Sequence, residues 1–161
     1  MTYHIRKIKP TDNKALAEVI RTVLTQQGNN MDGTVFTDSN TDKMFDCYQT
    51  ESSVYYVVFV DDILVGGFGV NHLPGENDSI CELQRLFLKK DVRGNGIGQK
   101  LMDLCIEFAK ASKYKLMYLE TFPNMQEAIG LYQKNGFNLI DHAMGNTGHF
   151  YCTTRMTLKL R

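Results

Sequence analysis

A short glycine-rich segment of this chain combines residue types and spacing that could bind a ligand. It reads Arg93-Gly94-Asn95-Gly96-Ile97-Gly98 and lies after a predicted strand, at the start of a predicted helix. Glycines let a backbone approach a ligand closely because they carry no Cβ atom. The free N–H groups at the start of a helix attract anions. The segment therefore predicts a binding site for phosphate oxygens.

Two common glycine motifs do not fit this segment. Gln99 stands where the last glycine of the dinucleotide-binding pattern G-x-G-x-x-G would lie. The Gly-Lys-Ser/Thr of a P-loop is also missing. Both motifs require these residues at fixed positions, so neither is present. Taken alone, the segment leaves a plain strand-to-helix turn without a ligand as the alternative.

The hydrophobic pattern predicts the elements that must position this segment. Strands are expected at 5–9, 54–60, 63–71, 80–88, 115–122, 137–141 and 150–158. Helices are expected at about 13–27, from the glycine segment to 112, and from 123 to 135. Asp12 is predicted to cap the first helix, and a short helix near 44–49 interrupts the polar segment 29–53.

The predicted order, β-α-β-β-β-α-β-α-β-β, favours a mixed sheet with helices on both faces. A chain of 161 residues suits one domain with a hydrophobic core, and we expect a single domain over 1–161. The four cysteines are widely separated, without a C-x-x-C pair, so no metal site is expected.

Charge and hydropathy narrow the class of partner. The net charge is zero, so a general nucleic-acid footprint is absent. Apolar runs such as Val54–Val60 are far too short to cross a bilayer, and the first residues do not resemble a signal peptide. We therefore expect a cytoplasmic protein with no nucleic-acid partner and no membrane partner.

The distribution of charge is more informative than its sum. Residues 28–82 contain ten acidic residues and one basic residue, Lys43, whereas 83–115 contain eight basic and three acidic residues. Such asymmetry would attract cations to one end of the molecule and anions to the other. Two ordinary solvated surfaces are the alternative.

Two segments together resemble the cofactor motifs of the GNAT superfamily of N-acetyltransferases. Leu86-Phe87-Leu88 and, four residues later, Arg93–Gly98 are similar to its pyrophosphate-binding motif Arg/Gln-x-x-Gly-x-Gly/Ala. The run Asn124-x-x-x-Ala128-x-x-Leu131-Tyr132-x-x-x-Gly136-Phe137 resembles the second motif of that family. The resemblance covers nearly the whole chain and implies a mostly antiparallel sheet with splayed central strands.

The resemblance also implies how acetyl-CoA would bind. The pantetheine would pair with the backbone of Leu86, Phe87 and Leu88 like an added strand. The pyrophosphate would lie on the loop formed by Arg93, Gly94, Asn95, Gly96, Ile97, Gly98 and Gln99. Asn124 would approach the cofactor, although a capping box with Glu127 is a compatible structural role.

Transfer of an acetyl group to an amine requires a base and an acid. A lysine-like amine has a pKa of about 10 and must lose a proton before it attacks, and the departing thiolate must gain one. The resemblance implies Glu82 as the base, directly or through water, and Tyr132 as the acid. The structural alternatives are a surface glutamate paired with Arg85 or a lysine, and a core tyrosine.

We therefore expect an acetyltransferase that joins acetyl-CoA and a primary amine in a ternary complex. The acceptor is a small-molecule amine or a peptide, and the acidic segment 28–82 favours a cationic one. His72 and His149 lie in segments that could border its pocket. A non-catalytic acyl-CoA sensor is the alternative function. A homodimer is a further possibility, because GNAT relatives are often dimers.

Overall fold

Seven strands form one sheet in the order β1-β2-β3-β4-β5-β7-β6 in the computed structural model, which describes all of residues 1–161. The strands are β1 (Tyr3–Lys7), β2 (Val54–Val60), β3 (Ile63–His72), β4 (Ile80–Leu88), β5 (Leu116–Thr121), β6 (Asn138–Ile140) and β7 (Thr154–Lys159). The helices are α1 (Asn13–Gln26), α2 (Ile97–Ala111) and α3 (Gln126–Lys134), with 3-10 segments η1 (Pro10–Asp12), η2 (Ser39–Tyr48) and η3 (Lys90–Val92). No helix is long and apolar enough to span a membrane.

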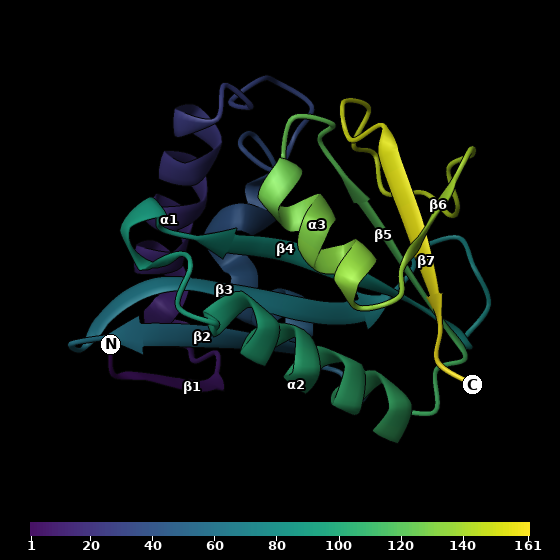
Figure 1. The fold of residues 1–161 in the computed structure, drawn as a ribbon, viewed down its shortest axis with the longest axis horizontal. Helices are drawn as coiled ribbons and strands as arrows, with labels where there is room; N and C mark the ends of the chain where they lie inside the picture. The colour runs from purple at the N-terminus through teal and green to yellow at the C-terminus, as the bar shows by residue number, and fades with distance from the viewer.

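Helices cover both faces of the sheet (Figure 1). Successive side chains of a strand point to opposite faces, so β2 contributes to two separate cores. Val54 and Val58 belong to the core under α2 and α3. Tyr55 and Val57 belong to the core under α1 and η2. The predicted mixed sheet with helices on both faces is therefore confirmed.

The two central strands separate after a short stretch of pairing. β4 and β5 run parallel and pair only at Ile80↔Leu116, Cys81↔Met117 and Glu82↔Tyr118. All other neighbouring strands are antiparallel. Beyond Glu82 the strands diverge (Figure 1), as the prediction of splayed central strands requires. Both sides of the divergence contribute to the cavities described below.

Two predicted helix caps are wrong. The Asp12 side chain does not cap α1; it accepts hydrogen bonds from the Lys9 backbone N–H at 2.7 Å and from the Arg6 guanidinium at 2.7 and 3.0 Å. α3 begins at Gln126, two residues after Asn124, and its N-terminus has no side-chain cap. The chain makes a turn over residues 122–125, closed by a hydrogen bond from the Met125 N–H to the Phe122 carbonyl oxygen, so the predicted capping box of Asn124 and Glu127 does not form.

Candidate functional site

The glycine segment forms the loop after η3 and the first residues of α2, which begins at Ile97. Gly94 and Gly96 have φ values of 78° and 79°, in the left-handed region that favours glycine. Nothing lies within 4 Å of the point where a Cβ atom would stand on either residue. The space in front of the α2 N-terminus is therefore open to a ligand.

Hydrogen bonds inside the loop fix its shape. The Arg93 side chain donates from Nε and Nη2 to the Leu88 carbonyl oxygen at 3.0 and 2.8 Å, which ties the loop to the end of β4. Asn95 Nδ2 donates to the carbonyl oxygens of Val92 and Arg93 at 3.1 and 3.2 Å. The loop therefore keeps its backbone N–H groups at the helix start pre-arranged for an anion.

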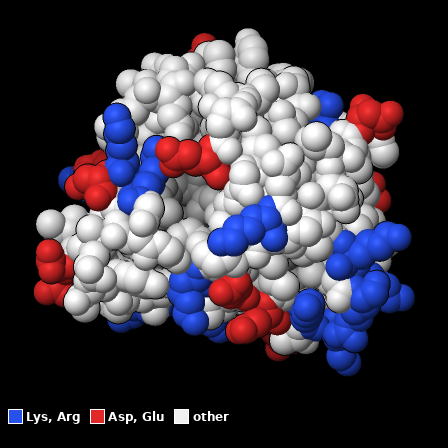
Figure 2. All heavy atoms as spheres, in the orientation of Figure 1, with Lys and Arg blue, Asp and Glu red and all other residues white.

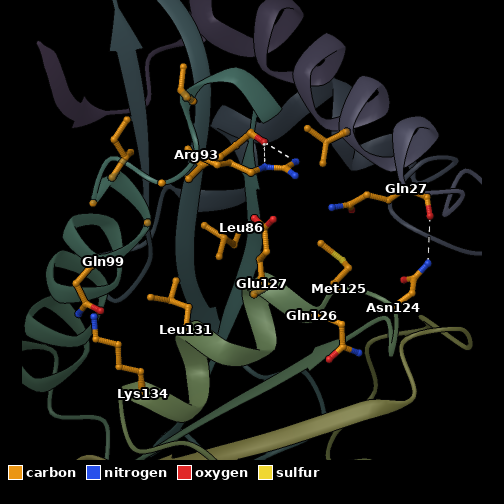
Figure 3. Close-up of a pocket in the computed structure, with 18 residues that line it drawn as sticks. Gln27, Leu86, Arg93, Gln99, Asn124, Met125, Gln126, Glu127, Leu131 and Lys134 are labelled. Atoms are coloured by element: carbon orange, nitrogen blue, oxygen red, sulfur yellow. Dashed lines mark hydrogen bonds between the residues drawn. The ribbon is translucent and has the colours of Figure 1, made fainter. Parts of the chain in front are cut away.

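A cavity of about 460 Å³ opens beside this loop (Figure 3). It lies between β4 and the loop on one side and α3 on the other, and the end of α1 closes it. Figure 2 shows it as a hollow with both basic and acidic side chains on its rim. The predicted cofactor residues that line it are Leu86, Leu88, Arg93, Gly94, Gly96, Ile97, Gly98, Gln99 and Asn124.

The other two predicted cofactor residues do not line this cavity. The Phe87 side chain is buried in the core under α1, because neighbouring residues of a strand face opposite sides. Asn95 instead holds the loop, as described above. Sequence reasoning missed Glu127 and Lys134, which line the cavity from α3. Their spacing places them on one face of the helix that follows Asn124, and this was the available signal.

Asn124 lies where the end of α1 meets the segment before α3. Its Nδ2 donates to the Gln27 carbonyl oxygen at 3.1 Å and to Asn29 Oδ1 at 3.1 Å. Its Oδ1 accepts from Asn29 Nδ2 at 3.0 Å. The amide therefore has both donor hydrogens engaged by the protein, and one acceptor lone pair remains for a ligand.

A second, smaller cavity of about 60 Å³ adjoins the first. Leu86 and Met125 line both cavities, so the two are neighbours. The second cavity is rich in titratable side chains. Those that line it are Glu82, Arg85, Glu120, Tyr132, His149 and Cys152. This cavity brings together the two predicted catalytic residues, which are 50 positions apart in the sequence.

Glu82 is a buried carboxyl group, only 6% exposed. Gln84 Nε2 donates a hydrogen bond to Glu82 Oε1 at 2.5 Å. Burial raises the pKa of Glu82 to about 7, and the charge of Glu120 adds to the rise, while the Gln84 bond and Arg85 oppose it. Near neutral pH, Glu82 can therefore exchange a proton with a bound group.

Tyr132 is also buried, with 6% of its surface exposed. Its ring packs against Phe68 and Phe137, with centroid distances of 6.5 and 5.9 Å. Its hydroxyl makes no hydrogen bond to the protein, although the residue lines the second cavity. Burial raises the pKa of Tyr132 well above its usual range, so the hydroxyl stays protonated at neutral pH. The residue is both a core tyrosine and an available donor.

His149 links the walls of the second cavity. Its Nε2 lies 3.7 Å from Asp38 and its Nδ1 lies 3.8 Å from Glu120. Burial lowers the pKa of His149, and the charge of Arg85 lowers it further. His72 lies elsewhere, against the carbonyl oxygen of Glu76, and lines neither cavity.

Sequence reasoning missed Arg85 and Glu120 as site residues. Both are charged residues inside predicted strands, and that was the available signal, because a charge in a buried strand needs a partner or a function. Of the ten acidic residues in 28–82, only Glu82 lines the second cavity, and Asp42 is paired with Arg21 at 2.6 Å. The excess of acidic residues in 28–82 therefore does not correspond to one acidic surface at the second cavity.

Comparison with known proteins decides the family. Residues 22–137 match the model of the acetyltransferase (GNAT) family. The chain belongs to the GNAT family. An uncharacterized N-acetyltransferase of Escherichia coli K12, YjgM, is 38% identical over 157 residues, which cover 97% of this chain and 94% of that protein. The predicted enzyme class, an N-acetyltransferase, is thus confirmed.

Solved structures of other acetyltransferases share the fold of this GNAT enzyme. An acetyltransferase of the GNAT family from Staphylococcus aureus has a TM-score of 0.83 at 19% identity and covers 99% of this chain and 100% of its own. The PaiA N-acetyltransferase of Thermoplasma acidophilum, solved in complex with coenzyme A, has a TM-score of 0.75 at 20% identity and covers 99% of both chains. These similarities confirm the architecture.

Proposed function

We propose that this GNAT enzyme moves an acetyl group from acetyl-CoA to a primary amine, with acetyl-CoA in the first cavity and the amine in the second. The observation that carries the proposal is that the two cavities adjoin at Leu86 and Met125. One has an open helix N-terminus that suits phosphates, and the other holds two groups suited to proton transfer. The two reactants would therefore meet where the cavities join.

The first cavity fits the chemistry of coenzyme A. The loop from Arg93 to Gln99 presents the α2 N-terminus, and the missing Cβ atoms of Gly94 and Gly96 leave room for a pyrophosphate. The backbone of Leu86, Phe87 and Leu88 lies on the part of β4 that β5 does not pair, so it can bind an extended pantetheine. The Thermoplasma acidophilum protein, which shares the fold, was solved in complex with coenzyme A, and this supports coenzyme A as the ligand.

Glu82 would take the proton of the incoming amine. Its raised pKa of about 7 makes it a stronger base than an exposed glutamate while leaving much of it ionised at neutral pH. The amine nitrogen then forms a bond to the acetyl carbon, and the carbon–sulfur bond breaks. A water between Glu82 and the amine would serve the same purpose.

Tyr132 would give a proton to the departing sulfur. Burial raises the pKa of Tyr132, so its hydroxyl is protonated at neutral pH and is present as a donor when the thiolate departs. The hydroxyl makes no hydrogen bond to the protein, and the residue lines the second cavity, so the hydroxyl is available to donate to the sulfur. A backbone N–H of Phe87 or Leu88 would stabilise the negative charge on the acetyl oxygen.

The test is thiol release from acetyl-CoA in the presence of a mixed panel of primary amines. We expect release well above the amine-free blank for at least one acceptor. Acetyl-CoA binding is measured in parallel by calorimetry. Tight binding of acetyl-CoA together with a blank rate for every amine would overturn the proposal and favour a non-catalytic acyl-CoA sensor.

A further inference from the structure

A buried cation lies in the wall of the second cavity. Arg85 occupies a bulge of β4, with φ at 55°, where the pairing of β3 with β4 shifts between Gly67 and Gly69. Its side chain is 10% exposed and lines the cavity beside Glu82 and Glu120. A left-handed conformation is unfavourable for a non-glycine residue. The bulge places this guanidinium beside the cavity at a cost in backbone strain.

The donors of this guanidinium are incompletely used. Nη1 donates to the Tyr48 hydroxyl at 3.1 Å and to Gln84 Oε1 at 3.3 Å. Nη2 reaches Asp38 only at 3.3 Å, which is long for a charge-assisted bond. Nε is buried and has no partner. On the Nε–Nη2 edge of Arg85, Nε therefore has no acceptor and Nη2 has only the long bond to Asp38, and a buried unpaired donor costs free energy.

Arg21 shows what a completed arginine site looks like in the same molecule. Its Nη1 and Nη2 bind the two carboxylate oxygens of Asp42 at 2.6 and 2.8 Å, and its Nε donates to the Phe36 carbonyl oxygen at 3.1 Å. Arg21 is more exposed than Arg85, at 32% against 10%. The more deeply buried guanidinium is therefore the one with the weaker set of partners.

A single side chain connects this guanidinium to the proposed base. The Gln84 amide donates to Glu82 through Nε2 and accepts from Arg85 and Tyr48 through Oε1. The base and the cation therefore lie on either side of one amide group. A compact molecule that carries an amine and a carboxylate on neighbouring atoms could reach both, and the cavity itself is small.

We propose that the acceptor is an amine with an adjacent carboxylate, as in a free α-amino acid, and that the Nε–Nη2 edge of Arg85 binds this carboxylate. The inference rests on the proposed acetyl transfer and names the acceptor class of that site. Two parallel N–H···O bonds are the geometry in which arginine recognises carboxylates. The charged or titratable groups around the acceptor are Glu82, Glu120, Asp38, Arg85, His149, Tyr132 and Cys152. An acceptor such as spermidine, with a second positive charge in place of the carboxylate, would place that charge against Arg85.

The parent enzyme is tested first with matched acceptors. A panel of α-amino acids is compared with their primary amides, their decarboxylated amines and spermidine, by kcat/KM at saturating acetyl-CoA. We expect the best amino acid to exceed its amide and its decarboxylated amine by about tenfold or more, because those analogues leave the Arg85 donors unpaired. Faster transfer to the amides, the decarboxylated amines or spermidine would overturn the inference and leave acetyl transfer intact.

Arg85→Lys then tests the residue itself. Lysine keeps the positive charge but lacks the paired N–H donors of the guanidinium, so kcat/KM for the amino acid should fall about tenfold or more. The value for the decarboxylated amine should change less than about twofold. Arg6→Lys is the matched control, because Arg6 on β1 forms the same kind of two-donor pair with Asp12 of η1, and neither residue lines a cavity. An equal loss for both acceptors in Arg85→Lys would mean that Arg85 only holds the fold.

A binding measurement makes the result independent of turnover and of the variant's stability. The parent protein, saturated with coenzyme A, is titrated in a calorimeter with the N-acetyl form of each amino acid and with the corresponding N-acetyl amide. We expect the carboxylate form to bind about tenfold or more tightly. Equal affinities would overturn the inference even if no acceptor in the panel were acetylated.

Discussion

The two cavities of this enzyme are built from different parts of the chain. The first depends on one contiguous loop, Arg93–Gly98, whose backbone N–H groups and absent Cβ atoms form the binding surface. The second depends on side chains from distant segments, with Glu82 on β4, Glu120 on β5 and His149 just before β7. Substitutions should therefore act differently, through backbone conformation in the first cavity and through individual functional groups in the second.

The largest effect is expected from Tyr132→Phe in the second cavity. Loss of the hydroxyl should lower kcat about 10²–10⁴-fold, because proton donation to the sulfur is lost. The ring stays between Phe68 and Phe137, so thermal stability and acetyl-CoA affinity should change little. Steady-state kinetics and calorimetry measure the two. Near-parental kcat would mean that water or another group is the acid, and loss of folding would assign Tyr132 to the core alone.

Glu82→Gln should have the next largest effect, with a dependence on pH. A base is useful only when ionised, so the parent rate should rise as pH increases through about 7, where Glu82 loses its proton. The variant should lose about 10²-fold at neutral pH and recover partly at high pH, where the amine deprotonates without help. Rates measured from pH 5 to 10 provide the check. The same pH profile in both proteins would show that Glu82 takes no part.

The same carboxyl group should affect stability in the opposite direction. Its folded pKa of about 7 exceeds the ordinary value of 4.5, so the folded state binds the proton more tightly. The free energy of unfolding is therefore greatest below about pH 4.5 for this group and falls as pH rises to about 7, by roughly 3 kcal/mol at 1.36 kcal/mol per unit. Glu82→Gln should flatten this part of the stability profile in urea unfolding. A parallel decline in the variant would assign the pH dependence to other groups.

Gly96→Asp tests the first cavity, where the backbone rather than a side chain is expected to bind. The new carboxylate would stand at the α2 N-terminus, beside the expected pyrophosphate, and its repulsion should weaken acetyl-CoA binding about tenfold or more, which is 1.4 kcal/mol. Calorimetry measures the affinity.

Two control variants separate the causes. Gly96→Ala adds the strain of the φ of 79° without charge, so it should lose less affinity than Gly96→Asp. Gly130→Asp adds the same charge on α3 at a residue that does not line the first cavity, so it should keep parental affinity. Parental affinity in Gly96→Asp itself would remove the basis for placing the cofactor at this loop.

The two cavities also differ in how far sequence could predict them. The loop was found because its glycines, the preceding strand and the following helix are adjacent in sequence, and the fold followed from the alternating strands and helices. Arg85 and Glu120 were missed because their association depends on the bulge in β4 and on the divergence of β4 from β5. A hydrophobic pattern does not encode a bulge or the contacts of Asn124, so the predicted capping box was wrong as well.

Asn124→Ala is expected to have the smallest effect, and it asks whether a side chain contributes to the backbone-built first cavity. Removing the amide breaks its bonds to Gln27 and Asn29, which should lower the free energy of unfolding by about 1 kcal/mol. Asn29→Ala is the matched control, because it removes the two amide bonds between Asn29 and Asn124 and keeps the Gln27 bond, and Asn29 does not line the cavity. We expect similar stability losses in the two variants. The affinity for acetyl-CoA should fall, about threefold, only in Asn124→Ala, because Asn124 lines the cavity and its Oδ1 keeps one acceptor lone pair that the protein does not use. Equal affinity losses in both variants would show that Asn124 acts by holding the start of α3 against α1.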